Sequence, residues 1–126
     1  MFTVIVLALS GLLLLSVGAM RLSNPIRNYA KNSGITLVDD VNLLNEMRGT
    51  SALMLAGGAT VLSGTVAEQM AFSSLIVATL IFFGFAIGRV VSMRLDGKPN
   101  KLLVQGLLFE LIFGSLAATA LVLRAV

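Results

Sequence analysis

Four long apolar stretches, separated by short polar segments, form the main pattern of the chain. Three of them contain no charged residue: Met1–Met20, Gly49–Ala67 and Gln69–Gly88. The fourth, Leu102–Leu123, contains one, Glu110. A helix needs roughly 20 mostly apolar residues to cross the hydrocarbon core of a bilayer. The pattern therefore predicts an all-α fold: an integral membrane four-helix transmembrane bundle, forming a single domain over residues 1–126.

The first apolar stretch has the features of a retained helix rather than those of a cleaved signal peptide. A signal peptide has a basic segment before a shorter apolar core and a cleavage site of small residues. Here no basic residue precedes Arg21, and the apolar run is long. We therefore expect this stretch to remain as the first transmembrane helix.

The polar segment after Arg21 predicts a short helix in the first loop. Asn24 is a suitable N-cap, Pro25 suits the first helical position and Gly34 marks the end. Tyr29 would lie on an apolar face, with the basic residues elsewhere, which is typical of an interfacial helix in the cytoplasmic headgroup layer. An irregular surface loop is the alternative interpretation.

The second long helix is expected to begin before its uncharged stretch. Asp39–Asp40 provides an N-cap, so the helix should start near Val41. Asn42, Asn45 and Glu46 then fall on one polar stripe in its first two turns, because residues three and four apart are neighbours on a helix surface. This stripe would lie near or inside the cytoplasmic leaflet.

Rows of small residues predict where the helices pack, because small side chains let backbones approach closely in a membrane. The row on the last helix includes Glu110, so we expect this carboxylate to point toward protein and away from lipid. The small residues of the predicted rows are Gly11 and Gly18; Ala52, Ala56, Thr60 and Gly64; Gly84 and Gly88; and Gly106, Gly114 and Ala118.

Glu110 is the carboxylate that most needs an explanation. It lies roughly 12 Å along its helix from Leu102, at the helical rise of about 1.5 Å per residue. A charge at that depth costs at least a few kcal/mol unless it is paired, hydrated or protonated. Arg89 is the preferred partner and Arg48 the second choice, because both lie toward the same side. The predicted polar cluster consists of Asn42, Asn45, Glu46, Arg48, Arg89, Gln105 and Glu110.

Two interpretations of this cluster carry equal weight. Buried polar groups can hold helices in register, each contributing about 1 kcal/mol in a membrane. They can also form a site for a ligand or a proton, since ionisable groups inside membranes are often functional. The chain has no Cys and no His, so it lacks the commonest general base and the commonest transition-metal ligands. We predict no catalytic residue and no metal site, and we identify no cofactor beyond the option of a bound lipid or quinone.

The charge balance indicates topology rather than nucleic-acid binding. Nine Lys and Arg residues against six Asp and Glu residues give a net charge of +3. Eight of the nine lie in or beside the first and third loops, and Arg124 is the exception. The positive-inside rule makes these loops cytoplasmic and places both termini outside. The same basic residues would attract anionic lipid headgroups.

Two motifs resemble a known family. The chain reads NEMRG before the small-residue helix, then GRVVSMRLDGKP, and then has a glutamate in its last helix. This combination resembles the bacterial domain-of-unknown-function family 4345, in the wider DoxX-like group. The resemblance implies a four-helix bundle in the bacterial inner membrane and does not indicate a reaction. Some members of the wider group are associated with quinone-linked redox complexes. A role of that kind for this chain would rest on similarity of fold alone. The residues that carry it are Asn45, Glu46, Arg48, Gly88, Arg89, Ser92, Asp96, Gly97, Pro99 and Glu110.

Four functions remain open. We favour a binding module for a lipid, a quinone or another amphipathic small molecule. The alternative is an accessory or structural subunit of a larger membrane complex, or a homo-oligomer. Either would pack through the small-residue faces. A proton-coupled exporter comes third, because small multidrug transporters have their essential glutamate in the first helix and pockets rich in Trp and Tyr, whereas this chain has no Trp and a single Tyr. An enzyme comes last, for want of a nucleophile–base pair.

Overall fold

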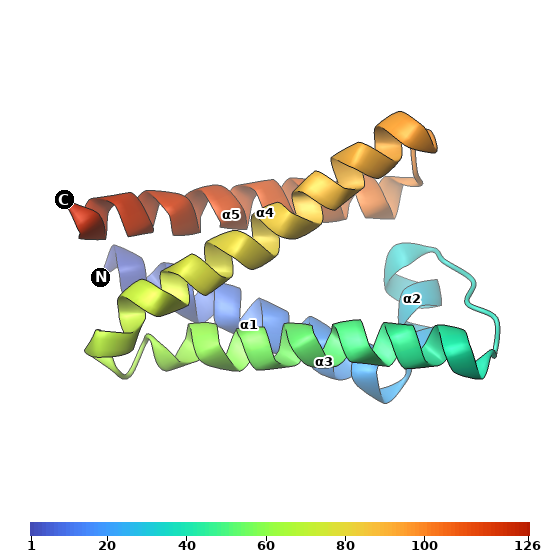
Figure 1. Ribbon diagram of the computed structural model, residues 1–126, viewed down its shortest axis with the longest axis horizontal. Helices are drawn as coiled ribbons and strands as arrows, with labels where there is room; N and C mark the ends of the chain where they lie inside the picture. The colour runs from blue at the N-terminus through green and yellow to red at the C-terminus, as the bar shows by residue number, and fades with distance from the viewer.

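The computed structural model describes residues 1–126, and all of its regular elements are helices, without strands. The two termini lie at one end of the molecule, and the connections after α1 and after α4 lie at the opposite end (Figure 1). The helices are α1 (Phe2–Ser23), α2 (Pro25–Ser33), α3 (Val41–Ser63), the 3-10 helix η1 (Glu68–Met70), α4 (Ala71–Leu95) and α5 (Lys101–Ala125).

Local signals in the sequence begin and end the helices at the first loop as predicted. The side chain of Asn24 accepts a hydrogen bond from the backbone N–H of Arg27 at 3.2 Å, and Pro25 follows as the first residue of α2. Gly34 ends α2 with a φ of 64°, a left-handed conformation that glycine adopts without steric cost. Asp40 caps α3 in the same way as Asn24 caps α2, through the N–H of Leu43 at 2.9 Å.

Three of the four long helices are long and apolar enough to cross a membrane: α1, α4 together with η1, and α5. This indicates a membrane protein. α3 is not among the three, because its first two turns carry the charges of Glu46 and Arg48. The expected fourth span, over Val41–Ser63, stays a prediction, as does the interfacial position of α2.

α1 and α3 form the most closely packed pair, and glycines make the close approach possible. A Cβ atom built on Gly18 would lie 2.7 Å from the backbone nitrogen of Leu55, and one on Gly58 would lie 2.7 Å from that of Leu15. Gly11 is similarly close to Leu62, at 3.0 Å from its Cβ. The predicted seam on α1 is therefore confirmed.

The predicted row on α3 is confirmed at Gly64 and wrong at Ala52 and Ala56. Gly64 is buried, and a Cβ atom built on it would lie 2.7 Å from Cβ of Ser74 on α4. Ala52 and Ala56 are exposed, whereas Ser51 and Gly58 are buried against α1. Adjacent residues on a helix are about 100° apart, so a shift of one or two positions moves the contact to another face. The sequence of α3 offers small residues on both faces, and the pattern alone did not distinguish them.

α4 and α5 form the second pair, and here the row on α5 faces α4 as predicted. Phe82 stacks on Phe113 with 5.4 Å between ring centroids. A Cβ atom on Gly114 would come within 2.6 Å of the Phe83 ring, so only glycine fits there. The expected contact through Gly84 and Gly88 is wrong, because both are exposed and a Cβ atom on either would meet nothing within 4 Å.

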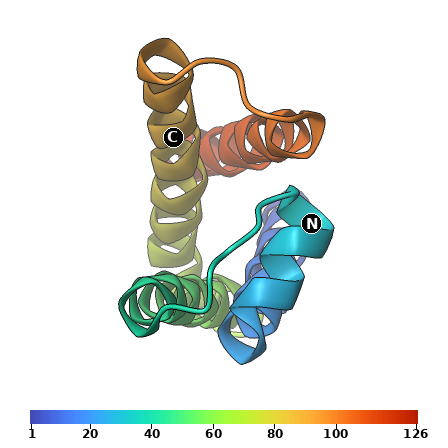
Figure 2. The same cartoon turned by 90° about the vertical axis from the view of Figure 1, so that its right-hand side faces the viewer.

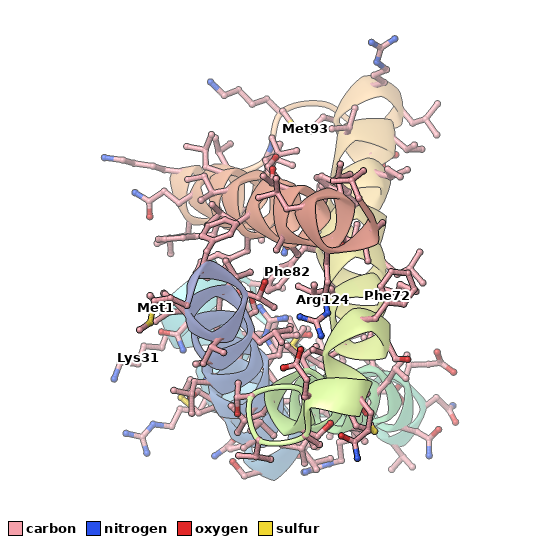
Figure 3. All side chains as sticks on the ribbon, turned by 90° about the vertical axis from the view of Figure 1, so that its left-hand side faces the viewer. Met1, Lys31, Phe72, Phe82, Met93 and Arg124 are labelled. Atoms are coloured by element: carbon pink, nitrogen blue, oxygen red, sulfur yellow. The ribbon has the colours of Figure 1, made fainter.

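The two pairs meet near the end that holds the termini. Ser74 of α4 donates a hydrogen bond to the carbonyl oxygen of Thr60 on α3 at 2.8 Å, and Ile81 packs against Gly57. The buried Phe82 lies between the pairs when the molecule is viewed from this end (Figure 3). Toward the opposite end, α4 leads away from α3 (Figures 1 and 2).

Candidate functional site

The predicted ion pair between Glu110 and Arg89 is present. The Nε–H group of Arg89 on α4 donates to both carboxylate oxygens of Glu110 on α5, at 2.8 Å each. The side chain of Arg89 is 24% exposed and that of Glu110 is 12% exposed, so the pair is largely shielded from the surroundings of the protein. A carboxylate within an apolar helix thus has a fixed counter-charge on the neighbouring helix.

Gly106 makes room for this arginine on the surface of α5. A Cβ atom built on Gly106 would lie 3.6 Å from Nη2 and 3.8 Å from Cζ of Arg89. A longer side chain at this position would occupy the place of the guanidinium group. The spacing of Gly106 and Glu110, one helical turn apart, therefore provides both the space for Arg89 and its counter-charge.

Arg21 is a further charged residue of the site, although we predicted only a role in topology for it. Its guanidinium lies over the ring of Tyr29, with Cζ 4.5 Å from the ring centroid, which is a cation–π contact. Nη2 donates to Ser33 Oγ at 3.4 Å, a long hydrogen bond, while Nε is buried and has no hydrogen-bond partner. The signal that could have revealed it is the chain reversal at Asn24–Pro25, which turns α2 back over the end of α1.

The other members of the predicted cluster do not join Arg89 and Glu110. Asn42, Asn45 and Glu46 are exposed on α3, and Gln105 is exposed on α5. The stripe on α3 forms one face as predicted, but that face lies outside the packed interior.

Arg48, the second choice as a partner for Glu110, is engaged elsewhere. Its Nη1 donates to the carbonyl oxygens of Leu22 and Ser23, the second at 3.5 Å. These are carbonyl groups at the C-terminal end of α1, which lack partners within the helix. Arg48 therefore caps α1 and ties it to α3.

A cavity of about 780 Å³ lies between α3 and α4, with α2 and the end of α1 beside it. The cavity lining changes character along α4, from Ser92 and Arg89 to Phe85 and Leu80. Arg21, Tyr29 and Ser33 belong to the polar end, whereas Leu53, Met54 and Ile81 belong to the apolar remainder.

A second cavity of about 300 Å³ adjoins the first and contains the ion pair. It shares Arg21, Met54, Phe85 and Arg89 with the first cavity, and Glu110 lies in its wall. The two arginines thus stand where the two cavities meet. No group of three or more His, Cys, Asp and Glu residues is placed to hold a metal ion.

The apolar helices and the ion pair shielded between two of them define the class of small helical membrane proteins. A family model described as "Domain of unknown function (DUF4345)" matches residues 2–121, and the chain belongs to this family. The family resemblance of the sequence is thereby confirmed, whereas the relationship to the wider DoxX-like group stays a prediction. Neither the curated proteins nor the solved structures include a match to the chain.

Proposed function

We propose that this protein binds an amphipathic small molecule, a lipid or a quinone, in the cavity between α3 and α4. One observation carries the proposal: both charged residues of the cavity, Arg21 and Arg89, lie at one end of it, while the lining farther along α4, from Phe85 to Leu80, is apolar. An amphipathic molecule needs a polar environment for its head group and an adjoining apolar environment for its tail. The volume of about 780 Å³ falls within the roughly 300–1,000 Å³ of small-molecule pockets.

The rims of the cavity support entry from the bilayer. Leu53 on α3 and Leu80 on α4 line it and are 70% and 68% exposed. Large apolar side chains this exposed suit a surface that faces lipid tails. A molecule dissolved in the membrane could then move sideways between α3 and α4 without crossing water.

The proposal includes four membrane crossings. α3 runs antiparallel to α1 along a glycine seam, and both termini lie at the same end, which suits an even number of crossings (Figure 1). Eight of the nine basic residues belong to the first and third loops and the helix ends beside them, so we place these loops in the bacterial cytoplasm and both termini outside the inner membrane.

α2 would lie at the cytoplasmic surface and cover the polar end of the cavity. It crosses the end of α1 (Figure 2), and Lys31 points away from the other helices (Figure 3). Tyr29 and Ser33, on the same short helix, line the cavity. Because Tyr29 faces the protein and Lys31 faces outward, α2 can lie at the membrane surface with its basic side chain near anionic headgroups.

Filling the cavity tests the proposal. Gly88 lines the cavity and has open space around it, so Gly88→Leu should occupy ligand volume without disturbing the helix packing. Gly49→Leu is the matched control, because Gly49 is also a helical glycine with open space but lies outside the cavity lining. Each protein is purified in mild detergent, and bound small molecules are extracted and counted by mass spectrometry.

We expect an amphipathic molecule in about equimolar amount on the wild type and on Gly49→Leu, and at least about tenfold less on Gly88→Leu, since overfilled pockets reject their ligands. Equal amounts on all three proteins would mean that the molecule is bound outside this cavity. No bound molecule on any of them, in membranes and in detergent, would refute the proposal.

An accessory subunit of a larger complex is the second candidate. The exposed small residues Ala52 and Ala56 on α3 favour it, because another helix could approach closely there. The same purification distinguishes the two, since a stable partner protein in constant ratio, with no extracted small molecule, would favour the subunit.

A further inference from the structure

We infer that the head group of the bound molecule is a single negative charge, held between Arg21 and Arg89. The inference rests on the proposed function and specifies the ligand as a monoanionic lipid with a carboxylate or phosphate head group. Three features of the site carry it: the count of charges, the free hydrogen-bond donors, and the way in which Arg21 is held.

The charges that line the two adjoining cavities do not balance. Arg21, Arg89 and Glu110 are the charged residues of their walls, so one positive charge remains. Arg89 is matched by Glu110, whereas Arg21 has no carboxylate partner. An uncompensated charge in a membrane is costly, and such charges pair with an opposite charge or reach water. One monoanion would make the site neutral.

The donors of the two guanidinium groups are only partly used. Arg21 Nε is buried without an acceptor, and its Nη2 reaches Ser33 only at 3.4 Å. Arg89 uses Nε for Glu110, and its terminal nitrogens make no hydrogen bond within the protein. Buried donors usually have acceptors, and of these donors Nε of Arg21 is the buried one without an acceptor. A carboxylate or phosphate supplies two or three acceptor oxygens and matches the planar fork of a guanidinium.

Arg21 is held at the cavity rather than free to extend to the surface. The Tyr29 ring lies against its guanidinium, with 4.5 Å between Cζ and the ring centroid, and the long hydrogen bond to Ser33 adds a weaker contact. Both residues belong to α2, and both line the same cavity. α2 therefore places an arginine with an unused donor at the polar end of an otherwise apolar cavity.

The chain provides its own reporter for this site. Tyr29 is the only tyrosine and there is no tryptophan, so fluorescence excited in the tyrosine band reports on the cavity wall. The full chain in a neutral detergent is titrated with three probes. Oleate has the chain and the charge, oleyl alcohol has the same chain with a neutral head, and acetate has the charge without the chain.

We expect saturable binding of oleate with an affinity at least about tenfold higher than that of oleyl alcohol, because the carboxylate forms a charge-assisted hydrogen bond that the alcohol does not. We expect no saturable binding of acetate. Arg21→Met should weaken oleate binding by a similar factor and leave oleyl alcohol unchanged. Arg94→Met is the matched control, because Arg94 is an exposed arginine of α4 outside the cavity and its loss changes the net charge equally.

The outcomes separate this inference from the proposed function. Equal affinity of the wild type for oleate and oleyl alcohol would overturn the anionic head group and keep the amphipathic ligand. Acetate binding as tightly as oleate would show a site for small anions instead of lipids. Equal weakening in Arg94→Met and Arg21→Met would reduce the effect to overall charge and refute the role of Arg21. If neither long-chain probe binds saturably, the proposed function itself fails; and if Arg21→Met does not fold, the wild-type comparison of probes still decides.

Discussion

Removing one member of the Arg89–Glu110 pair should destabilise the protein, and removing both should restore part of the loss. Breaking a buried ion pair costs about 3–5 kcal/mol, because the remaining charge is stranded. Arg89 is 24% exposed and Glu110 is 12% exposed, so some water reaches the pair. We therefore expect about 2–4 kcal/mol for each single substitution, below the fully buried range.

The two single substitutions should not be equivalent. Glu110→Gln leaves Arg89 and Arg21 together in the walls of one cavity with no carboxylate between them. Arg89→Met leaves Glu110 with Arg21 as a neighbouring positive charge. Glu110→Gln should therefore be the more harmful change. In the double variant neither charge of the pair is stranded, and we expect a favourable coupling of about 1–2 kcal/mol between the two positions.

The assay is reversible unfolding of the purified protein in mixed micelles, with helicity as the signal and the free energy of unfolding as the result. Arg94→Met serves as the control for removing an exposed arginine from the same helix. Strictly additive losses in the double variant would refute the pairing as an energetic interaction. If the double variant recovers stability but not ligand binding, the pair is part of the binding site. If it recovers both, the pair serves only to hold α4 and α5 together.

Three further predictions follow from the packing and the helix ends. Gly18→Leu should destabilise the protein strongly in thermal unfolding, because a Cβ atom there would lie 2.7 Å from the α3 backbone, whereas Gly84→Leu should be tolerated; equal losses would contradict the assigned faces. Asn100 caps α5 and also donates a hydrogen bond to the carbonyl oxygen of Ser33 at 2.9 Å. Asn100→Ala should therefore lower the free energy of unfolding by about 1 kcal/mol from the lost helix cap alone, and it should speed proteolysis of the first loop. An unchanged cleavage rate would mean that this hydrogen bond does not hold the loop. A reporter active only outside the cytoplasm should function when fused after Val126, and activity of a cytoplasmic reporter there would reverse the topology.

The sequence predicted the helices and their ends well because these depend on local signals. Asn24 and Asp40 each accept a hydrogen bond from the N–H three positions on, and Gly34 ends α2 through its own left-handed backbone, so these roles can be read without the fold. The Arg89–Glu110 pair was predictable for a different reason. A carboxylate inside an apolar helix requires a counter-charge at similar depth, and Arg89 on the preceding helix provides one.

The rotation of each helix about its axis was harder to predict. α3 and α4 carry small or apolar residues on every side of their membrane-length portions, so hydrophobicity does not say which side meets a neighbour. Gly84 and Gly88 form a common packing motif, yet they border a cavity instead of a helix. Arg21 was missed because its role depends on α2 folding back to bring Tyr29 and Ser33 against it, and the chain reversal at Asn24–Pro25 indicates that fold-back only indirectly.

The most direct test of the binding site is photo-crosslinking in native membranes with a fatty acid that carries a diazirine group in its chain. Labelled peptides are mapped by mass spectrometry, with excess unlabelled oleate as the competitor. We expect labels that oleate competes away on residues 47–54 of α3 and 80–92 of α4, the segments that contribute to the cavity wall. The binding site would be contradicted by labels that the competitor does not reduce and that are spread over exposed residues such as Leu9, Leu12 and Leu108.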